Sequence, residues 1–172
     1  SKTMYLFDED VKYLSGNGAV LDKSVALEVL PSRKGIAMTD NDVQLQLPFS
    51  LDGTSSIDLS KGGSTISVTP YHITSLFQIR SSTNAVLKQK DTLANKVDYA
   101  NVFGSGTSVR YTPTLNGYKE DIILENNTGE HRFSFVVSTG NLRLVLQDDH
   151  VLFLDQKTET PIAQMAPIYV YD

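Results

Sequence analysis

The apolar positions of this chain fall in short runs that are separated by polar positions. Val, Ile, Leu, Phe and Tyr dominate these runs, and Gly, Asn, Asp, Ser or Thr bound almost all of them. This pattern is typical of β-strands joined by turns. Strands are therefore expected at residues 5–7, 11–14, 20–30, 43–47, 56–59, 65–69, 75–79, 85–88, 96–99, 108–112, 118–124, 132–137, 141–147, 150–154 and 162–171.

Helical periodicity is weak along the chain. Residues 83–95 offer the best candidate, but the polar run 88–91 interrupts the apolar stripe that a surface helix needs. We interpret this segment as a strand and a loop. So many short strands favour an all-β fold, a multi-stranded antiparallel β-sandwich, with an extended, supersandwich-like layered form as the alternative. At 172 residues, one domain over 1–172 is the default.

The clearest local prediction is a β-hairpin around the Asn-Gly pair at 116–117. Asn-Gly between two β runs favours a type I′ turn, because both central residues need positive φ. With that turn, Tyr111 would lie opposite Ile122 on a mainly apolar face. Glu120 would share this face, opposite Pro113, close enough to the hairpin tip to reach water or a cation. Lys119 and Glu120 would point to opposite faces and would not pair.

Downstream of residue 132 the pattern predicts a meander. Turns at 138–141 and 148–149 would join the strands that begin at residues 133, 142 and 151. The run 151–154 is apolar at every position, which predicts a central strand covered on both sides.

Composition and charge narrow the function classes. The net charge is −5 and the acidic and basic residues are dispersed, so nucleic acid is not an expected partner. Cysteine is absent, which excludes disulfides and thiolate chemistry but leaves the compartment open. No apolar run reaches the roughly 18 residues of a membrane span, and residues 1–4 lack the apolar core of a signal peptide. If the parent protein is exported, its signal would lie upstream.

The candidate chemistry is sparse. His72, His131 and His150 fall on separate segments without metal-ligand spacing, so no zinc site is expected. The acidic clusters 8–10 and 40–42 lack the Gly and distal Glu of a calcium loop, although calcium between loops stays open. Residues 104–108 are not a nucleophile elbow, residues 61–64 are interpreted as a hairpin turn, and no carboxylate pair stands out. We therefore predict no catalytic, cofactor-binding or metal-binding residue and no enzyme.

Sugar binding is the main alternative. Aromatic platforms often hold glycans on β-sandwiches, but this chain has no Trp. A glycan site would need exposed tyrosines from the set Tyr5, Tyr13, Tyr71, Tyr99, Tyr111, Tyr118, Tyr169 and Tyr171.

The second half of the chain also resembles a known group of proteins. The residues that carry the resemblance are 97–103, 109–111 and 116–124, followed by 133–135, 142–146, 148–149, 153–155, 166–167 and 172, with looser agreement at 10–12, 16–18 and 41–45. These segments are similar to the N-terminal β region of bacterial RHS/YD-repeat and wall-associated proteins.

The resemblance implies a fragment of a large exported bacterial protein, secreted or held at the cell surface. It implies no catalytic residues in this region. The expected function is therefore a non-catalytic structural or interaction module that packs against neighbouring domains of the same polypeptide. A carbohydrate-binding module that contacts a cell-surface glycan is the alternative.

Overall fold

The structure is a computed structural model that describes residues 2–6, 11–31, 35–71, 83–84, 86–90, 93–127, 129 and 132–171. Over this part of the chain the regular elements are all β-strands, and every strand pair is antiparallel. The predicted all-β class is therefore confirmed. The predicted strand at residues 75–79 lies outside the described residues.

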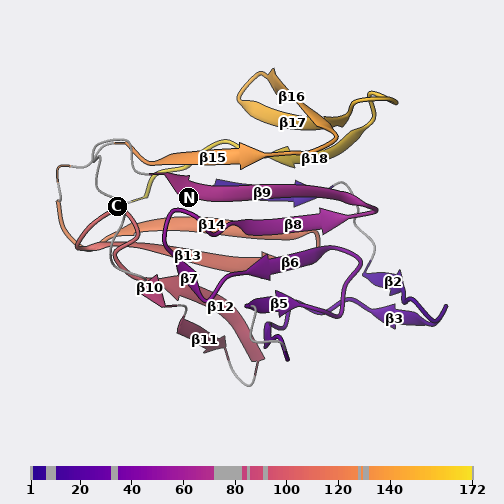
Figure 1. Cartoon of the computed structure of the whole chain (residues 1–172), viewed down its shortest axis with the longest axis horizontal. Helices are drawn as coiled ribbons and strands as arrows, with labels where there is room; N and C mark the ends of the chain where they lie inside the picture. The colour runs from indigo at the N-terminus through magenta and orange to yellow at the C-terminus, as the bar shows by residue number, and fades with distance from the viewer. Residues whose placement is uncertain are drawn as a thin grey trace.

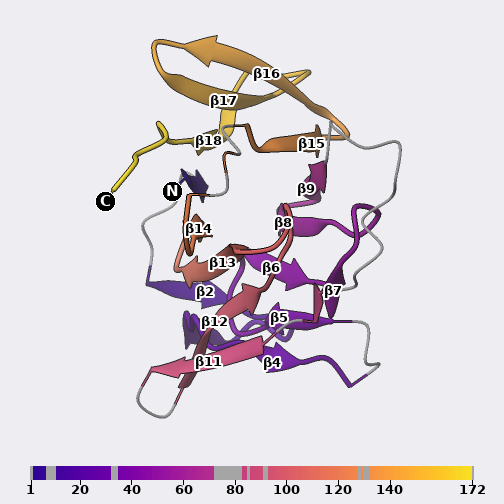
Figure 2. The same ribbon diagram turned by 90° about the vertical axis from the view of Figure 1, so that its left-hand side faces the viewer.

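Two large sheets face each other as the layers of a β-sandwich (Figures 1 and 2). One sheet has eight strands in the order β11-β12-β13-β14-β1-β18-β17-β16. In that order the strands are Val86–Lys90, Leu93–Tyr99, Thr107–Thr114, Gly117–Leu124, Lys2–Leu6, Pro161–Met165, His150–Asp155 and Leu142–Gln147. The second sheet has six strands in the order β15-β9-β8-β6-β5-β4. These are Ser134–Ser138, Ser64–Tyr71, Ile57–Lys61, Gln44–Leu47, Ile36–Met38 and Glu28–Val29.

Two short strand pairs complete the fold. β7 (Ser50–Leu51) pairs with β10 (Thr83–Asn84). β2 (Lys12–Leu14) pairs with β3 (Val20–Asp22) in a hairpin that extends beyond the ends of the neighbouring strands (Figure 1).

Strand β1 joins two halves of the eight-stranded sheet. It pairs with β14 from Lys2↔Glu120 to Tyr5↔Gly117, and with β18 through Met4↔Met165. Among the described strands of this sheet, β1 lies between the meander β11 to β14 and the meander β16 to β18. The first residues of the chain therefore hold together elements that are far apart in sequence.

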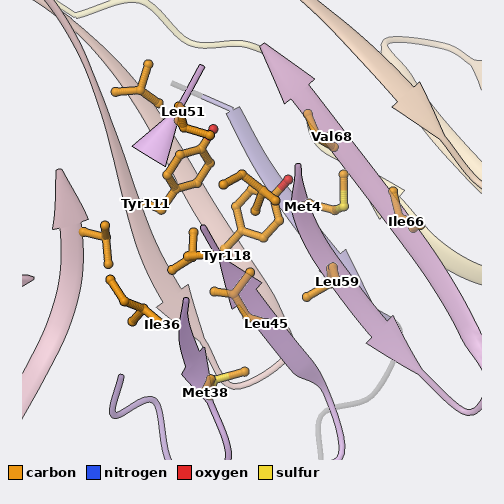
Figure 3. Packing of buried hydrophobic residues seen from close by; sticks show 14 of the residues in the cluster. Met4, Ile36, Met38, Leu45, Leu51, Leu59, Ile66, Val68, Tyr111 and Tyr118 are labelled. Carbon is orange, nitrogen blue, oxygen red and sulfur yellow. The ribbon is translucent and has the colours of Figure 1, made fainter. Parts of the chain in front are cut away.

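The core lies between the two layers because alternate residues of the strands point inward. The buried positions alternate with more exposed positions along β6, β8, β9 and β13. Tyr111 packs edge-on against both Tyr99 and Tyr118, with ring centroids 5.9 and 5.6 Å apart, opposite aliphatic side chains of the other sheet (Figure 3). A fully buried aliphatic or aromatic side chain contributes about 1.5–3 kcal/mol through burial.

The hairpin of β13 and β14 forms with the predicted faces but a different register. Tyr111 lies opposite Glu120 and Thr114 opposite Gly117, so the loop residues are Leu115 and Asn116. The predicted type I′ turn is wrong, because Asn116 does not have positive φ. A shift of the pairing by two residues preserves the side-chain alternation, so the apolar face still points inward.

The predicted meander after residue 132 is wrong in its first step and confirmed in its second, because the turn at 148–149 joins β16 to β17 as an antiparallel pair. β15 pairs with β9 in the six-stranded sheet, and the turn at 139–141 carries the chain to the other sheet. β17 is not the covered central strand that its apolar run predicts, because Phe153 is its one buried residue and the strand lies second from the edge.

The predicted element boundaries fail mainly where strands are short. The expected strand 20–30 is split into β3 and β4, and the expected strand 162–171 ends at Met165. The short strands β5 and β7 were not predicted. The hairpin turn predicted at 61–64 is confirmed, since Gly62 and Gly63 both have positive φ, at 58° and 86°.

Candidate interaction site

The most unusual polar group of the interior is the carboxylate of Glu120. The sequence places Glu120 on the apolar face, and the structure buries its side chain to 1% exposure. Lys2, directly opposite on β1, is 11% exposed and its Nζ lies 3.1 Å from Glu120 Oε1. The same Nζ lies 3.5 Å from the centre of the Phe135 ring, which comes from the other sheet. Lys2 therefore links three strands and both layers.

Two further polar groups are buried beside this ion pair. The hydroxyl of Tyr111 interacts with the Glu120 carboxylate, and the hydroxyl of Tyr118 is buried without a hydrogen-bond partner among the described residues. Burial raises the pKa of the Glu120 carboxyl, although the charge of Lys2 opposes the rise. The pKa values of Tyr111 and Tyr118 are raised well above the usual value, mainly because both hydroxyls are buried and secondly because the charge of Glu120 is close. These groups lie in the closed core of the sandwich.

Among the candidate metal ligands that the structure describes, no cluster forms. His72, His131 and the acidic cluster 8–10 lie outside the described residues. In the cluster 40–42, Asp42 Oδ1 lies 2.8 Å from Lys23 Nζ. The buried Asn41 donates from Nδ2 to the carbonyl of Leu115, at 3.1 Å, and so braces the β13–β14 turn. Over the described part of the chain, no group of three or more potential ligands forms.

The remaining candidates are turns and surface positions. His150 Nδ1 lies 3.0 Å from Asp149 Oδ1 beside a shallow cleft on β16, β17 and β18. Residues 104–106 form a turn that leads into β13.

Of the tyrosines whose side chains the structure describes, Tyr13 is half-buried and the others fall into two groups. Tyr99, Tyr111 and Tyr118 are buried in the core. Tyr71, Tyr169 and Tyr171 are exposed. Of the exposed set, Tyr169 and Tyr171 are alternate residues of the segment after β18, which places both near one surface feature.

That feature is a groove of about 460 Å³ at the edge of β14, which we call the edge groove. Residues 121–124 form one wall and residues 168–171 form the other, and Arg110 and Phe133 also line the groove. Most of these side chains are apolar. The wall 168–171 is strongly exposed, and Val170 and Tyr171 have 88% and 75% of their surface open to solvent.

The charges beside the edge groove are internally paired. Arg110 donates from Nε and Nη2 to the two carboxylate oxygens of Asp98, at 2.7 and 2.9 Å. The hydrogen bond to Asp98 raises the pKa of the Arg110 guanidinium above its usual value. Lys119 Nζ lies 2.9 Å from Asp121 Oδ1. The groove therefore presents an apolar surface with neutralised charges rather than a site for a charged small molecule.

The β2–β3 hairpin is a second apolar surface. Val11, Leu14, Val20 and Leu21 are exposed on this projecting element. Exposed clusters of this kind mark sites of contact with another surface more often than isolated apolar residues do.

Sequence reasoning missed the edge groove. The run Ile168-Tyr169-Val170-Tyr171 was interpreted as the end of a strand, although its uninterrupted apolar character, directly after Pro167, was the available signal. Nothing in the sequence showed that this segment would lie beside β14.

No family model, curated protein or solved structure matches the chain. The described residues contain no helix of the length and apolar character that crossing a membrane requires. The features of the molecule that bear on its function are therefore its exposed apolar surfaces, the edge groove and the β2–β3 hairpin.

Proposed function

We propose that this protein is a non-catalytic structural and interaction module that packs against neighbouring domains of the same, larger polypeptide. The observation that carries this proposal is the edge groove, an exposed and mainly apolar surface beside β14. Burial raises the pKa values of Glu120, Tyr99, Tyr111 and Tyr118, and all four groups lie in the core rather than in the groove. An apolar groove without converging polar groups suits a polypeptide surface better than a reacting substrate.

The resemblance to RHS/YD-repeat and wall-associated proteins supports the same proposal. A module of a large exported bacterial surface protein needs surfaces that dock onto adjoining domains. The edge groove and the β2–β3 hairpin are two such surfaces, and they involve separate parts of the sandwich. We assign the protein an extracytoplasmic, secreted or cell-surface location on the strength of that resemblance.

The proposal is tested by comparing the isolated domain with a longer polypeptide that carries it among its natural neighbours. Hydroxyl-radical footprinting reports the solvent exposure of Tyr171, Val170 and Leu14. We expect the modification rate of at least one of these residues to fall several-fold in the longer polypeptide, while exposed Leu146 on β16 serves as an internal control. Unchanged rates at all three test residues would contradict domain packing through these surfaces.

A carbohydrate-binding module is the second candidate, and the exposure of Tyr169 and Tyr171 beside the edge groove favours it. Tyrosine rings at a groove can stack on sugar rings. A glycan array with the intact domain and with the double variant Tyr169→Ala/Tyr171→Ala tests this function. Glycan binding that is lost in the double variant supports the carbohydrate-binding function. The absence of any binding at high micromolar glycan would refute it.

A further inference from the structure

The hairpin of β16 and β17 stands apart from the rest of the sandwich (Figures 1 and 2). Its first residue, Leu142, belongs to the core cluster and is 2% exposed. Exposure then rises along β16, to 45% at Leu144 and 75% at Leu146. These leucines are alternate residues, and they share the inner face of the sheet with the buried Phe153, which lies opposite Leu144. An apolar row therefore continues from the core to the exposed tip of the hairpin.

β16 also has an open edge. Among the described strands of its sheet, it pairs with β17 on one side and is the last strand on the other. The amide of Gln156 donates to the carbonyl of Asn141, at 3.2 Å, so the odd-numbered residues on this side of the hairpin bond across to β17. Because hydrogen-bonded pairs alternate along an antiparallel ladder, Leu144 and Leu146 direct their backbone N–H and C=O groups to the open side.

β16 lacks the features that usually protect a strand edge. Natural edge strands are interrupted by proline or by bulges, or they carry several charges. Residues 142–147 contain neither proline nor glycine, and they pair with β17 without a shift of register. Their one charge is that of Arg143, whose Nη2 lies 3.1 Å from Glu159 Oε1. This edge can therefore accept a further strand without a steric or electrostatic obstacle.

The sequence of β16 is nearly symmetric around Val145. Leu144 and Leu146 flank this residue, and Arg143 and Gln147 come next on the two sides. If two copies run antiparallel with Val145 opposite Val145, Leu144 of each copy lies opposite Leu146 of the other. Arg143 then faces the neutral Gln147, so that like charges do not meet. In the same register, the backbone groups that point to the open side face each other as hydrogen-bonded pairs.

We infer that β16 is a dimerisation strand: it pairs antiparallel with β16 of a second copy of this chain, around a two-fold axis at Val145. The pairing joins the two eight-stranded sheets and brings Leu144 and Leu146 of both copies together on the inner face. The interface is isologous, because the same patch meets itself. This inference goes beyond the proposed packing function, and it involves neither the edge groove nor the β2–β3 hairpin.

The symmetry of β16 is what favours a second copy as the occupant. A foreign strand would have to bring both an apolar row for the leucines and an uncharged residue opposite Arg143. β16 already carries both, at the spacing that its own pattern needs. Strand addition of this kind combines backbone hydrogen bonds with contacts of alternate side chains.

Sedimentation velocity of the intact 172-residue chain tests whether the dimer forms. We expect monomers at about 5 µM and dimers at about 500 µM, because one strand pair falls below the roughly 1,200 Å² of a stable complex. At the lower concentration Leu146 stays exposed, so it remains a valid reference for the footprinting of the longer polypeptide. A chain that is monomeric at both concentrations would overturn the inference and leave this edge to a strand of a different domain.

Two lysine variants locate the contact. Leu146→Lys introduces a charge at the most exposed position of the leucine row, and should raise the concentration at which half of the chains are dimeric by at least about tenfold. The matched control, Val20→Lys, places the same charge on the exposed β2–β3 hairpin and should dimerise as the unmodified chain does. Circular dichroism checks that both variants fold. A Leu146→Lys variant that dimerises like the unmodified chain would contradict a contact through β16.

Disulfide cross-linking tests the register, because the chain has no cysteine of its own. Val145→Cys places two thiols opposite each other at the two-fold axis, with Cα atoms about 4.5 Å apart, which a disulfide can span. The control Gln147→Cys lies on the same face, but its two thiols would be about 14 Å apart. With oxidised glutathione at about 500 µM chain, we expect Val145→Cys to form covalent dimers at least about tenfold faster than Gln147→Cys. Equal rates would refute the proposed pairing.

Discussion

The substitution Lys2→Met should destabilise the domain far more than removal of a surface charge does. It leaves the carboxylate of Glu120, which is 1% exposed, without the cation that lies 3.1 Å away. Removing one partner of a buried ion pair typically costs about 3–5 kcal/mol, because the remaining charge is neither solvated nor compensated. We expect a loss in this range at pH 8.

The matched control is Lys12→Met. Lys12 also lies directly opposite its partner, Asp22, on an antiparallel strand, but these side chains are 62% and 82% exposed. An exposed pair of this kind contributes less than about 1 kcal/mol. The comparison therefore separates burial from the mere presence of a cross-strand charge pair.

The pH dependence gives the prediction a second, independent readout. Burial raises the pKa of Glu120 in the folded state above its ordinary value of 4.5. The folded protein therefore binds this proton more tightly than the unfolded chain. The stabilisation from protonation is complete below the unfolded pKa and is lost as the pH rises through the folded pKa. Without Lys2 the folded pKa rises further, so Lys2→Met should be destabilised less at pH 5 than at pH 8.

Urea unfolding, followed by far-ultraviolet circular dichroism and tyrosine fluorescence, measures these free energies. Addition of Glu120→Gln to Lys2→Met should restore part of the lost stability, because the amide carries no charge, with a coupling energy of about 0.5–3 kcal/mol. If Lys2→Met costs no more than Lys12→Met, and its cost does not change between pH 5 and pH 8, the assigned role of this ion pair is wrong.

Two further predictions concern the packing of the sandwich. Gly35→Ala should cost more than about 3 kcal/mol, because the new Cβ would lie 2.4 Å from the carbonyl oxygen of Leu47 at a backbone φ of 149°. The control Gly16→Ala meets nothing within 4 Å and should change the free energy of unfolding by less than about 0.5 kcal/mol. Similar thermal midpoints for the two variants would contradict this prediction. Tyr118→Phe removes a buried hydroxyl without a partner and should be neutral or stabilising, whereas Tyr99→Phe leaves a backbone carbonyl without its donor and should cost about 1 kcal/mol. Urea midpoints give the order of these two variants, and a larger loss in Tyr118→Phe would refute it.

Local sequence features determined much of the β architecture. The alternation of apolar and polar residues correctly placed Tyr111, Tyr118 and Glu120 on the inner face of the β13–β14 hairpin. It did so because a strand has a period of two regardless of its partner. The Gly-Gly pair at 62–63 likewise predicts its own turn, since glycine adopts positive φ without steric cost.

The tertiary structure decided everything that depends on which strands meet. The register of the β13–β14 hairpin differs from the prediction by two residues, and the buried side chain of Asn41 braces the turn from a distant loop. β15 leaves the expected meander and pairs with β9 instead. Strand pairing is a non-local choice, and alternation in one segment carries no information about the partner.

The partner of Glu120 and the edge groove show the same limit. The sequence identified Glu120 as a misfit on an apolar face and allowed it a cation, but it could not identify Lys2. That pairing exists because β1 inserts between β14 and β18. The edge groove likewise exists because residues 121–124 and 168–171, which are far apart in sequence, line the same surface. The sequence by itself determined which side chains face inward; the order of strands in the sheet decided which of them meet.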